Sequence, residues 1–410
     1  MTGKLLSLAL RNVLRNRRRT IIAATAIGIG LAAMVFTDGL MIGMSDNLID
    51  SVTDTWLGDA QIHREGFLTT YSPELLVDSA AEVLDRLDRD PRVVASAPRV
   101  LAQGTVSSAA DLRSVILVGI DPERESRVSR IDDSIVGGEF LREEGGEGIL
   151  LGSKVAADLE VGLGDRVVVT ISQVESGIIY QDMIRVSGIV ETGTAAVDES
   201  MSFVSAGKAQ EMLGLPEDGF QEIAFTLSDR RLAEQADSNF WAGYSRGGNT
   251  ALGWPDLMAQ LDAVLAMSDF STLIMAVILF GLVAFGIMNA IFMSIYERIF
   301  EFGVMKAIGT RAGRIVSLVV LEAAWLAIIS IALGSLVGLA ATWLVAQQGI
   351  DYTGIELSGA TFREPVRPVL TLQQFIFYPL WVLLLTALVG LYPAVHAARI
   401  RPALAMRRSL

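Results

Sequence analysis

The side chains that carry most enzyme chemistry are sparse in this sequence. Its 410 residues include two histidines, His63 and His396, and no cysteine. This composition gives no cluster with zinc-ligand spacing and no Cys–His pair for nucleophilic catalysis. Residues 148–154 faintly resemble a phosphate-binding loop, but their glycine spacing is wrong and the order Ser153-Lys154 is reversed. We therefore predict no catalytic residue, no metal site and no cofactor bound by this chain.

A different kind of site is indicated between two long apolar segments. Residues 297–309 mix acidic, basic and apolar side chains over a length too short for a domain or for crossing a bilayer. This pattern predicts a helix along the membrane surface that offers a mixed-charge face to a cytoplasmic protein. A transporter subunit whose motor is a separate protein needs such a face. The candidate contact residues are Glu297, Arg298, Glu301, Phe302, Gly303, Met305, Lys306 and Gly309.

Four apolar segments each approach or exceed the roughly 20 residues that span a bilayer. Between the first two lies a long region of soluble composition with strand-like and helical stretches. The predicted fold is an α-helical membrane protein with four transmembrane helices and a large α+β extracytoplasmic domain between the first and second. The predicted divisions are an amphipathic helix at 1–19, transmembrane helices at 20–45, 270–296, 315–346 and 372–393, the α+β domain at 46–269, a cytoplasmic coupling helix at 297–314, an outer loop at 347–371 and a tail at 394–410.

The distribution of charge predicts the orientation. Residues 1–19 and the tail 394–410 contain several basic residues and no acidic one, whereas 46–269 contain more than twice as many acidic as basic side chains. Because Lys and Arg are retained on the cytoplasmic side, we expect both termini inside and the acidic domain outside. The apolar run 21–44 is too long for a typical signal peptide core, so we expect it to remain as the first span.

Within the outer domain we expect a helix at 74–88, a lobe division near 125–145, a loop at 237–255 and a helix at 256–269. Pairs of glycines four residues apart, in the third span (Gly334 and Gly338) and in the first (Gly39 and Gly43), permit close helix contact.

Glu322 is an ionisable residue within the third span. A charge inside the membrane is costly, so we expect Glu322 to pair with a neighbouring helix or subunit.

Six segments, in order across nearly the whole chain, resemble the MacB/FtsX-type permease family. The fourth is closest to its lipoprotein-releasing (LolC/LolE-like) members. The four spans, with the large domain between the first two, also match that family's layout. The segments are ALRNVLRNRRRT at 9–20, GDAQIHREGF at 58–67, LLGSKVAADLEVGLGD at 150–165, VSGIVETG at 186–193, ERIFEFGVMKAIG at 297–309 and PAVHAARIRP at 393–402.

The resemblance implies a multi-pass inner-membrane permease subunit of an ABC transporter, with its large domain in the periplasm. It implies that the chain pairs with a second permease, either another copy or a paralogue, and binds a cytoplasmic ABC ATPase dimer through the coupling helix. ATP and magnesium would be bound by that ATPase, and this chain would be non-catalytic and bind no nucleic acid. Motion would pass through the first two spans to the outer domain.

The resemblance also implies a function, lipoprotein extraction from the inner membrane. Acyl chains would then lie in a vestibule whose candidate lining residues are Met41, Ile42, Phe270, Ile274 and Ile278, and ordinary lipid-facing packing explains these residues about as well. Two alternatives stay open: an exporter that works with a periplasmic adaptor and an outer-membrane channel, and an FtsX-like activator of a cell-wall hydrolase.

Lipoprotein-releasing members carry a hairpin that recruits a periplasmic carrier, and residues 171–182 correspond to it. Within it, Ile178, Ile179 and Tyr180 are either a contact for a periplasmic partner or part of a buried strand. The segment is short and lacks proline.

Overall fold

The computed structural model describes residues 2–142, 148–174, 176–234 and 239–400. Its contacts divide the chain into two compact units. The helical unit comprises Met1–Ser45, Ala266–Asp351 and Pro365–Leu410, and the α/β unit comprises Asp46–Leu265 and Tyr352–Glu364. The predicted basic residues Arg401, Arg407 and Arg408 of the tail lie outside the described ranges.

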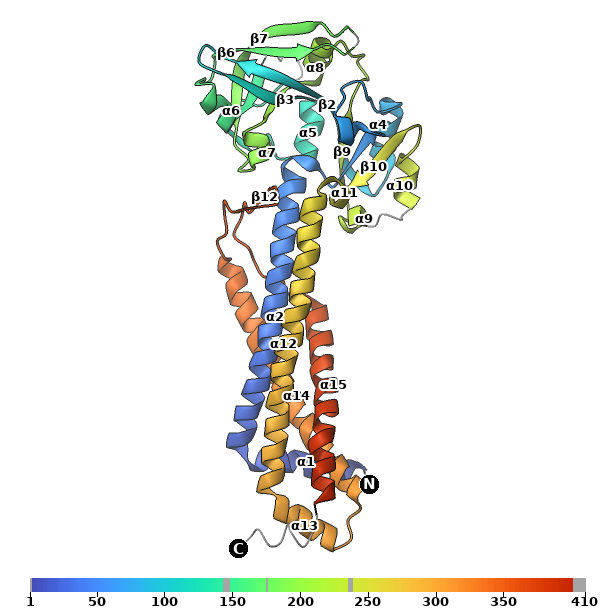
Figure 1. The fold of residues 1–410 in the computed structure, drawn as a ribbon, viewed down its shortest axis with the longest axis vertical. Coiled ribbons are helices and arrows are strands. Elements are labelled where there is room, and N and C mark those ends of the chain that lie inside the picture. The colour runs from blue at the N-terminus through green and yellow to red at the C-terminus, as the bar shows by residue number, and fades with distance from the viewer. Residues whose placement is uncertain (1, 143–147, 175, 235–238, 401–410) are drawn as a thin grey trace. The chain divides into compact units, whose positions relative to one another are not determined.

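Among the described residues, four helices are long and apolar enough to cross a membrane (Figure 1). Helix α2 continues beyond the predicted end of the first span at residue 45, and α12 begins before residue 270, so both are longer than a bilayer requires. The predicted N-terminal helix ends at Arg15, and Asn16 separates it from α2. The bounds are α1 Thr2–Arg15, α2 Arg17–Val52, α12 Ala259–Glu297, α13 Ile299–Ala307, α14 Ala312–Gln348 and α15 Leu372–Arg399.

Glycine allows α2 and α14 to approach closely. A Cβ atom added to Gly334 would lie 2.6 Å from the carbonyl oxygen of Gly28, and one added to Gly338 would lie 3.2 Å from Cα of Ala32. The glycine pair of the third span therefore makes the close helix contact that the sequence predicts. The pair in the first span differs, because an added Cβ on Gly43 would instead meet the carbonyl oxygen of Arg367, outside any helix.

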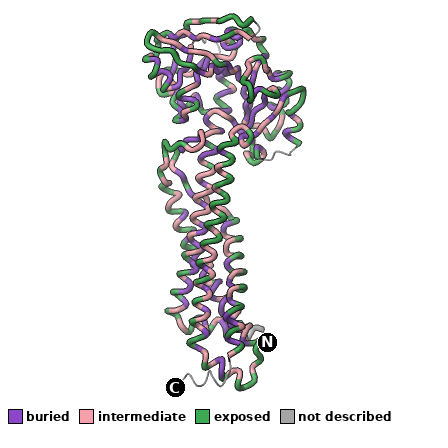
Figure 2. Tube along the Cα trace, viewed as in Figure 1, coloured by how far each residue is buried: buried purple, intermediate pink, exposed green. Residues whose placement is uncertain are grey.

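The spans differ in how much of their surface the rest of the chain covers. For each span we compare the 18 consecutive residues that are most apolar. Of these residues, 44% are buried in the span that includes α2 and 39% in α14, but 11% in α12. Figure 2 shows the buried and exposed residues along these helices. Helix α12 therefore keeps most of its apolar surface uncovered by this chain.

The α/β unit is built on a mixed sheet. Within the described ranges, ten strands follow the order β10-β1-β9-β2-β3-β8-β5-β7-β4, with β6 paired to β2 and β7. The long strand β2 pairs with β9 through its first half and with β3 and β6 through its second half, so it joins the two halves of the sheet. The bounds are β1 Ala60–Arg64, β2 Val93–Ser107, β3 Leu112–Ile120, β4 Ile135–Gly138, β5 Gly148–Gly152, β6 Arg166–Ser172, β7 Ile179–Val190, β8 Met201–Ser205, β9 Glu222–Leu227 and β10 Asn249–Gly253.

Short helices cover this sheet, and a separate hairpin lies in the segment 352–364. Together they confirm the predicted α+β domain. The helices are η1 Thr53–Leu57, α3 Phe67–Thr70, α4 Ala80–Arg89, α5 Pro122–Val128, α6 Ser153–Asp158, α7 Ala195–Asp198, α8 Ala206–Leu213, α9 Arg231–Glu234, α10 Asn239–Tyr244 and α11 Trp254–Leu257, and the hairpin is β11 Glu356–Leu357 with β12 Ala360–Thr361.

Three predictions inside this unit are wrong. The predicted loop 237–255 contains α10, β10 and α11 where it is described, and β10 pairs with β1 at the edge of the sheet. Its sequence NTALG has one β-branched residue, so its strand signal is weak. The predicted helix at 74–88 begins only at Ala80, because the backbone of Val77 donates to Phe220 instead. The predicted lobe division near 125–145 lies outside the described residues from 143 onward; its described part is not a boundary between compact units and contributes β4 to the sheet.

An arginine lies fully buried in the core of the α/β unit. Arg99 on β2 donates two hydrogen bonds to the carboxylate of Glu125, at 2.7 and 2.9 Å, and one to Glu222, at 2.6 Å. Its guanidinium also donates to the carbonyl oxygen of Trp56 and lies 3.6 Å from the centre of that indole ring. This Arg99 cluster therefore ties α5, β2 and β9 to η1.

Candidate functional site at the coupling helix

The predicted coupling segment forms a separate helix, α13, with a defined start and end. Arg298 has φ −113° and ψ 18°, outside the helical region, and this interrupts the path from α12 to α13. At the other end Gly309 has a left-handed φ of +89°, which glycine adopts without a Cβ clash. The backbone N–H of Thr310 then donates to Met305 and closes the helix.

Arg298 is the centre of a polar network at this helix. Its Nη1 donates to both carboxylate oxygens of Glu322 on α14, at 2.7 and 2.9 Å, and its Nε donates to Glu301 on α13 at 2.7 Å. The Nδ2 of Asn12 on α1 donates to the same Glu322 at 2.6 Å. Glu322 is therefore paired between helices, and a single arginine links α13 and α14, with α1 attached through Glu322.

The charges in this network stabilise one another. Burial lowers the pKa of Arg298, but the carboxylates of Glu322 and Glu301 raise it by more, so the guanidinium remains charged. Burial likewise raises the pKa of Glu301, and its hydrogen bonds from Arg298 and Arg15 outweigh this, so the net direction is downward. Both groups are thus ionised at neutral pH.

Further contacts hold α13 and the end of α12 against neighbouring helices. Arg15 on α1 donates to Glu301 on α13 at 2.6 Å, and Arg19 at the start of α2 donates to Glu297, the last residue of α12, at 2.7 Å. Lys306 donates to the carbonyl oxygens of Ala398 and Ile400 at the end of α15, at 2.7 and 3.0 Å. These carbonyls lack helical partners, so a lysine there is favourable.

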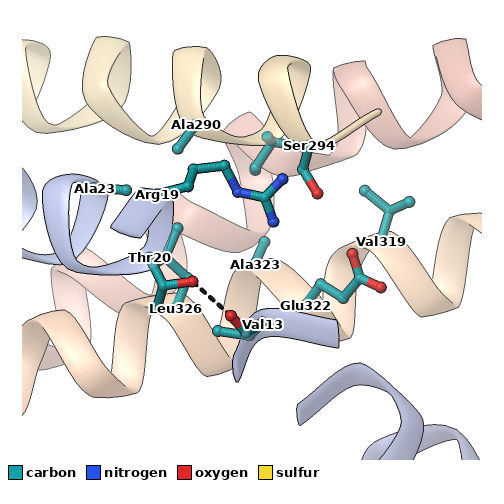
Figure 3. Close-up of a pocket in the computed structure, with 11 residues that line it drawn as sticks. Val13, Arg19, Thr20, Ala23, Ala290, Ser294, Val319, Glu322, Ala323 and Leu326 are labelled. Carbon is teal, nitrogen blue, oxygen red and sulfur yellow. Dashed lines mark hydrogen bonds between the residues drawn. The ribbon is translucent and has the colours of Figure 1, made fainter. Parts of the chain in front are cut away.

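A small cavity lies beside this network (Figure 3). Its volume is about 30 Å³, room for about one water molecule. Arg19 from α2 and Glu322 from α14 both face it, and the hydroxyl of Thr20 donates to the carbonyl oxygen of Val13 at its wall. The cavity is too small for a substrate, so the site is a packed helix junction.

The eight predicted contact residues differ in how far they are exposed. Arg298, Phe302 and Gly303 are buried, with Phe302 only 1% exposed. Met305 is half-buried, and Gly309 is exposed. The remaining three, Glu297, Glu301 and Lys306, take part in the contacts described above. Most of the mixed charge therefore holds α13 in place within this chain.

An exposed apolar row that was not predicted from the sequence runs along α13 and ends at Ile308, the residue directly after this helix. Phe300, Val304 and Ile308 are spaced four residues apart and are 46%, 37% and 78% exposed. Arg311 and Arg314, also exposed, follow in the chain. Residues four apart share one helix face, so the spacing was visible in the sequence, but the charged residues drew the interpretation. We call Phe300, Val304 and Ile308 the outer row.

The other predicted site residues lie as follows. On α12, Phe270, Ile274 and Ile278 are exposed along one face, whereas Met41 and Ile42 on α2 are half-buried. The hydroxyl of Ser268 on α12 lies 3.4 Å from the sulfur of Met41.

In the α/β unit, Ile178 and Ile179 are 62% and 69% exposed where the β6–β7 hairpin turns back, so this stretch is not a buried strand. Tyr180 is half-buried, and its hydroxyl donates to Glu211 at 3.3 Å.

Sequence comparisons identify the family. The MacB-like periplasmic core domain model matches residues 20–240, more than half of the chain, and the FtsX-like permease C-terminal model matches residues 273–402. The chain is 25% identical to a lipoprotein-releasing system transmembrane protein LolC of Xylella fastidiosa, over 78% of each chain. It is 23% identical to a LolE of Haemophilus influenzae, over 92% of each. An uncharacterised ABC transporter permease of Mycobacterium tuberculosis is 25% identical, over 81% of this chain and 84% of that one.

Among solved structures, the periplasmic region of MacB from Actinobacillus actinomycetemcomitans is 12% identical and gives a TM-score of 0.35, covering 50% of this chain and 92% of that one. The two family matches together span both the α/β unit and the last three membrane helices. The chain belongs to the MacB/FtsX-type family of ABC transporter permeases.

Proposed function

We propose that this chain is the permease subunit of an ATP-driven complex that extracts lipoproteins from the inner membrane. A separate ATPase dimer would bind ATP and magnesium, and this chain would transmit motion without hydrolysing nucleotide. The observation that carries the proposal is α13, a short helix tied to α1, α14 and α15 by charged side chains, with an apolar outer row left uncovered.

The contacts of α13 suit it to transmit force. A helix held only by its ends would bend when pushed, whereas α13 has ion pairs to two neighbouring helices and a lysine on the end of a third. Displacement of the outer row would therefore move α1, α14 and α15 with it. The outer row and the exposed Arg311 and Arg314 are the proposed ATPase contact, with both termini on the same, cytoplasmic side.

The membrane helices support pairing with a second permease. Of the four spans, helix α12 has the smallest share of buried residues. A second copy of this chain, or a paralogue, would cover part of its exposed surface. Phe270, Ile274 and Ile278 on that face, with Met41 and Ile42, are the proposed vestibule for acyl chains. Each methylene transferred from water to such a surface contributes about 0.8 kcal/mol.

Lipoproteins are proposed as the substrate because two of the relatives are named as parts of lipoprotein-releasing systems. The exposed Ile178 and Ile179 on the β6–β7 hairpin are the proposed contact for a periplasmic carrier, since apolar side chains at a hairpin favour protein contact.

The test is reconstitution of the full chain, its paired permease and its ATPase in proteoliposomes that carry a purified lipoprotein. We expect release into the aqueous phase that requires ATP. Release without ATP, or no release with an active ATPase, would contradict the proposal.

A variant tests the role of the outer row. Ile308→Asp places a charge in the proposed contact and should weaken ATPase binding by about 2 kcal/mol or more, roughly thirtyfold in affinity. Leu112→Asp is the matched control, since Leu112 is 57% exposed on the α/β unit. Equal ATPase binding by both variants would exclude the outer row as the contact.

A further inference from the structure

The α/β unit contains a second site, a pocket of about 310 Å³. This volume is at the lower end of the range of about 300–1,000 Å³ typical of small-molecule sites. The wall is mostly apolar and comes from sequence-distant elements: Trp56 on η1, Leu68 on α3, Leu101 on β2, Met201 on β8 and Met258 after α11. We call it the η1 pocket.

Several of the apolar side chains that line the η1 pocket are only partly covered. Trp56, Leu68, Leu101 and Met258 are half-buried, so the chain itself leaves apolar surface facing an open cavity. Methionines such as Met201 and Met258 adapt to differently shaped apolar ligands, because the unbranched thioether chain has several accessible rotamers.

One wall is held in an unusual backbone conformation. Helix α3 is only four residues long, and Gly66 before it and Tyr71 after it both have left-handed φ, +87° and +48°. A tyrosine in that region is strained, and such residues cluster at ligand sites. The arrangement presents Phe67, Leu68 and Tyr71 to the pocket.

The polar groups at the floor of the pocket are already bonded within the chain. Gln61 donates from Nε2 to the carbonyl oxygen of Leu57 at 2.9 Å, and its Oε1 lies 2.9 Å from Nε2 of His63. Glu222 is paired with Arg99 at 2.6 Å. A polar ligand gains little where the polar atoms already have partners, so this floor favours an apolar occupant.

The floor also offers no counter-charge to an anion. The single positive charge of Arg99 is shared between the carboxylates of Glu222 and Glu125. Burial lowers the pKa of the nearby His63, and Glu222 only partly opposes this, so the imidazole is neutral at pH 7. The cluster beneath the pocket therefore carries a net negative charge, so an anionic headgroup is disfavoured there and its place is at the open mouth beside the exposed Gln103.

We propose that the η1 pocket binds one acyl chain of an amphiphile, with the chain inside and the headgroup at the mouth. The volume limits the occupant to a single chain and excludes a helix, whose diameter with side chains is about 10 Å. If the acyl chain belongs to a lipoprotein, the inference rests on the proposed function. A free fatty acid or a phospholipid would occupy the same pocket independently of it.

The test is photocrosslinking in cells that make the full chain and are fed an alkyne-labelled fatty acid. Benzoylphenylalanine replaces Leu68 in the pocket or, as a control, Leu112, an exposed leucine outside it. After irradiation we expect several-fold more alkyne label on the chain from position 68 than from position 112. An adduct of unchanged gel mobility identifies a fatty acid or lipid, and a slower labelled adduct identifies an acylated protein.

A blocking variant tests occupancy of the cavity. Ala196 is an exposed residue that lines the pocket, so Ala196→Trp should fill it and abolish the label gained at position 68. Ala110→Trp, at an exposed position in the turn between β2 and β3, should leave the label unchanged. Benzoylphenylalanine at Leu257 provides a second pocket position if replacement of Leu68 prevents folding.

Equal label at positions 68 and 112, label that persists in Ala196→Trp, or only unlabelled protein adducts would overturn the proposal. Because the crosslink needs no ATP, it separates the pocket from the transport function. Labelling without lipoprotein release in proteoliposomes would support acyl binding in the η1 pocket and contradict lipoprotein as the substrate. Release without labelling would support the substrate and contradict acyl binding in the pocket.

Discussion

Each unit of the molecule contains a buried arginine bonded to two glutamates, Arg99 in the α/β unit and Arg298 in the helical unit. The two sites differ in whether other contacts also hold the bonded elements together. Arg99 bonds Glu125 and Glu222 on elements that already belong to one sheet and its cover, since β2 and β9 share backbone hydrogen bonds. Arg298 bonds Glu301 and Glu322 on two separate helices, one of which has only nine residues.

This difference predicts different consequences when each arginine is removed. Loss of Arg99 leaves two buried carboxylates without a counter-charge inside a framework that stays in register until it unfolds. The penalty should therefore appear as lost stability. Loss of Arg298 removes a tie between helices, and α13 can shift without unfolding. The penalty should therefore appear mainly as lost coupling.

The largest expected effect is that of Arg99→Met. Removing one partner of a buried ion pair costs about 3–5 kcal/mol, and here two carboxylates lose their partner. We expect the free energy of unfolding of the α/β unit to fall by that amount. Denaturant titration of the full chain in detergent measures it, with tryptophan fluorescence as the signal in a background where Trp56, 3.6 Å from the guanidinium, is the one tryptophan kept.

Two variants control this experiment. Arg113→Met removes an arginine that is 46% exposed and paired with Asp111 and Asp158, and it should cost about 1 kcal/mol or less. Replacing Arg99, Glu125 and Glu222 together by apolar residues should recover much of the loss, because no charge remains buried. An Arg99→Met protein as stable as Arg113→Met would show that the buried cluster is not what stabilises this unit.

The second effect separates coupling from stability. Arg298→Met should lower stability by about 1–3 kcal/mol, since among the described residues Glu322 keeps Asn12 alone as a hydrogen-bond donor. It should also abolish the proposed ATP-driven release, because α13 loses its bonds to α14. The double variant Arg298→Met/Glu322→Leu should regain stability without regaining release.

Arg18→Met, an exposed arginine at the same end of the chain, is the control and should change neither property. If the double variant regains release together with stability, the network matters only for folding, and the contrast with Arg99 disappears.

Much of the fold could be predicted from the sequence. Long apolar segments identify the four spans because a bilayer demands length and composition that soluble helices rarely have. The α+β character of the outer domain was readable from alternating strands and helices. Strand β10 was missed because its partner β1 lies almost 190 residues away in the chain, and a short strand owes its existence to such pairing.

The candidate site was harder to predict in detail. The segment 297–309 was identified, but which side of α13 faces outward depends on α1, α14 and α15, and the sequence does not show how these helices surround it. Charged residues usually mark a solvated face, so Glu301 and Arg298 were interpreted as contacts for a partner. Here they pair with one another, and the apolar outer row takes the exposed side.

The smallest expected effect concerns Glu301, the half-exposed carboxylate of the Arg298 network. Its pKa is lower in the folded protein than its ordinary value of 4.5, so its bonds stabilise the fold above pH 4.5 and are lost as pH falls through the folded value. Glu301→Gln should therefore be less stable than wild type by about 1 kcal/mol or less at neutral pH, and the difference should shrink below pH 4.5. Thermal unfolding of both proteins across this range measures the difference in stability.

Arg15→Met removes one hydrogen bond to Glu301, so the stability that ionised Glu301 contributes should begin to fall at a higher pH. A stability difference that stays constant down to the lowest pH would mean that the ionised form of Glu301 adds nothing to the network.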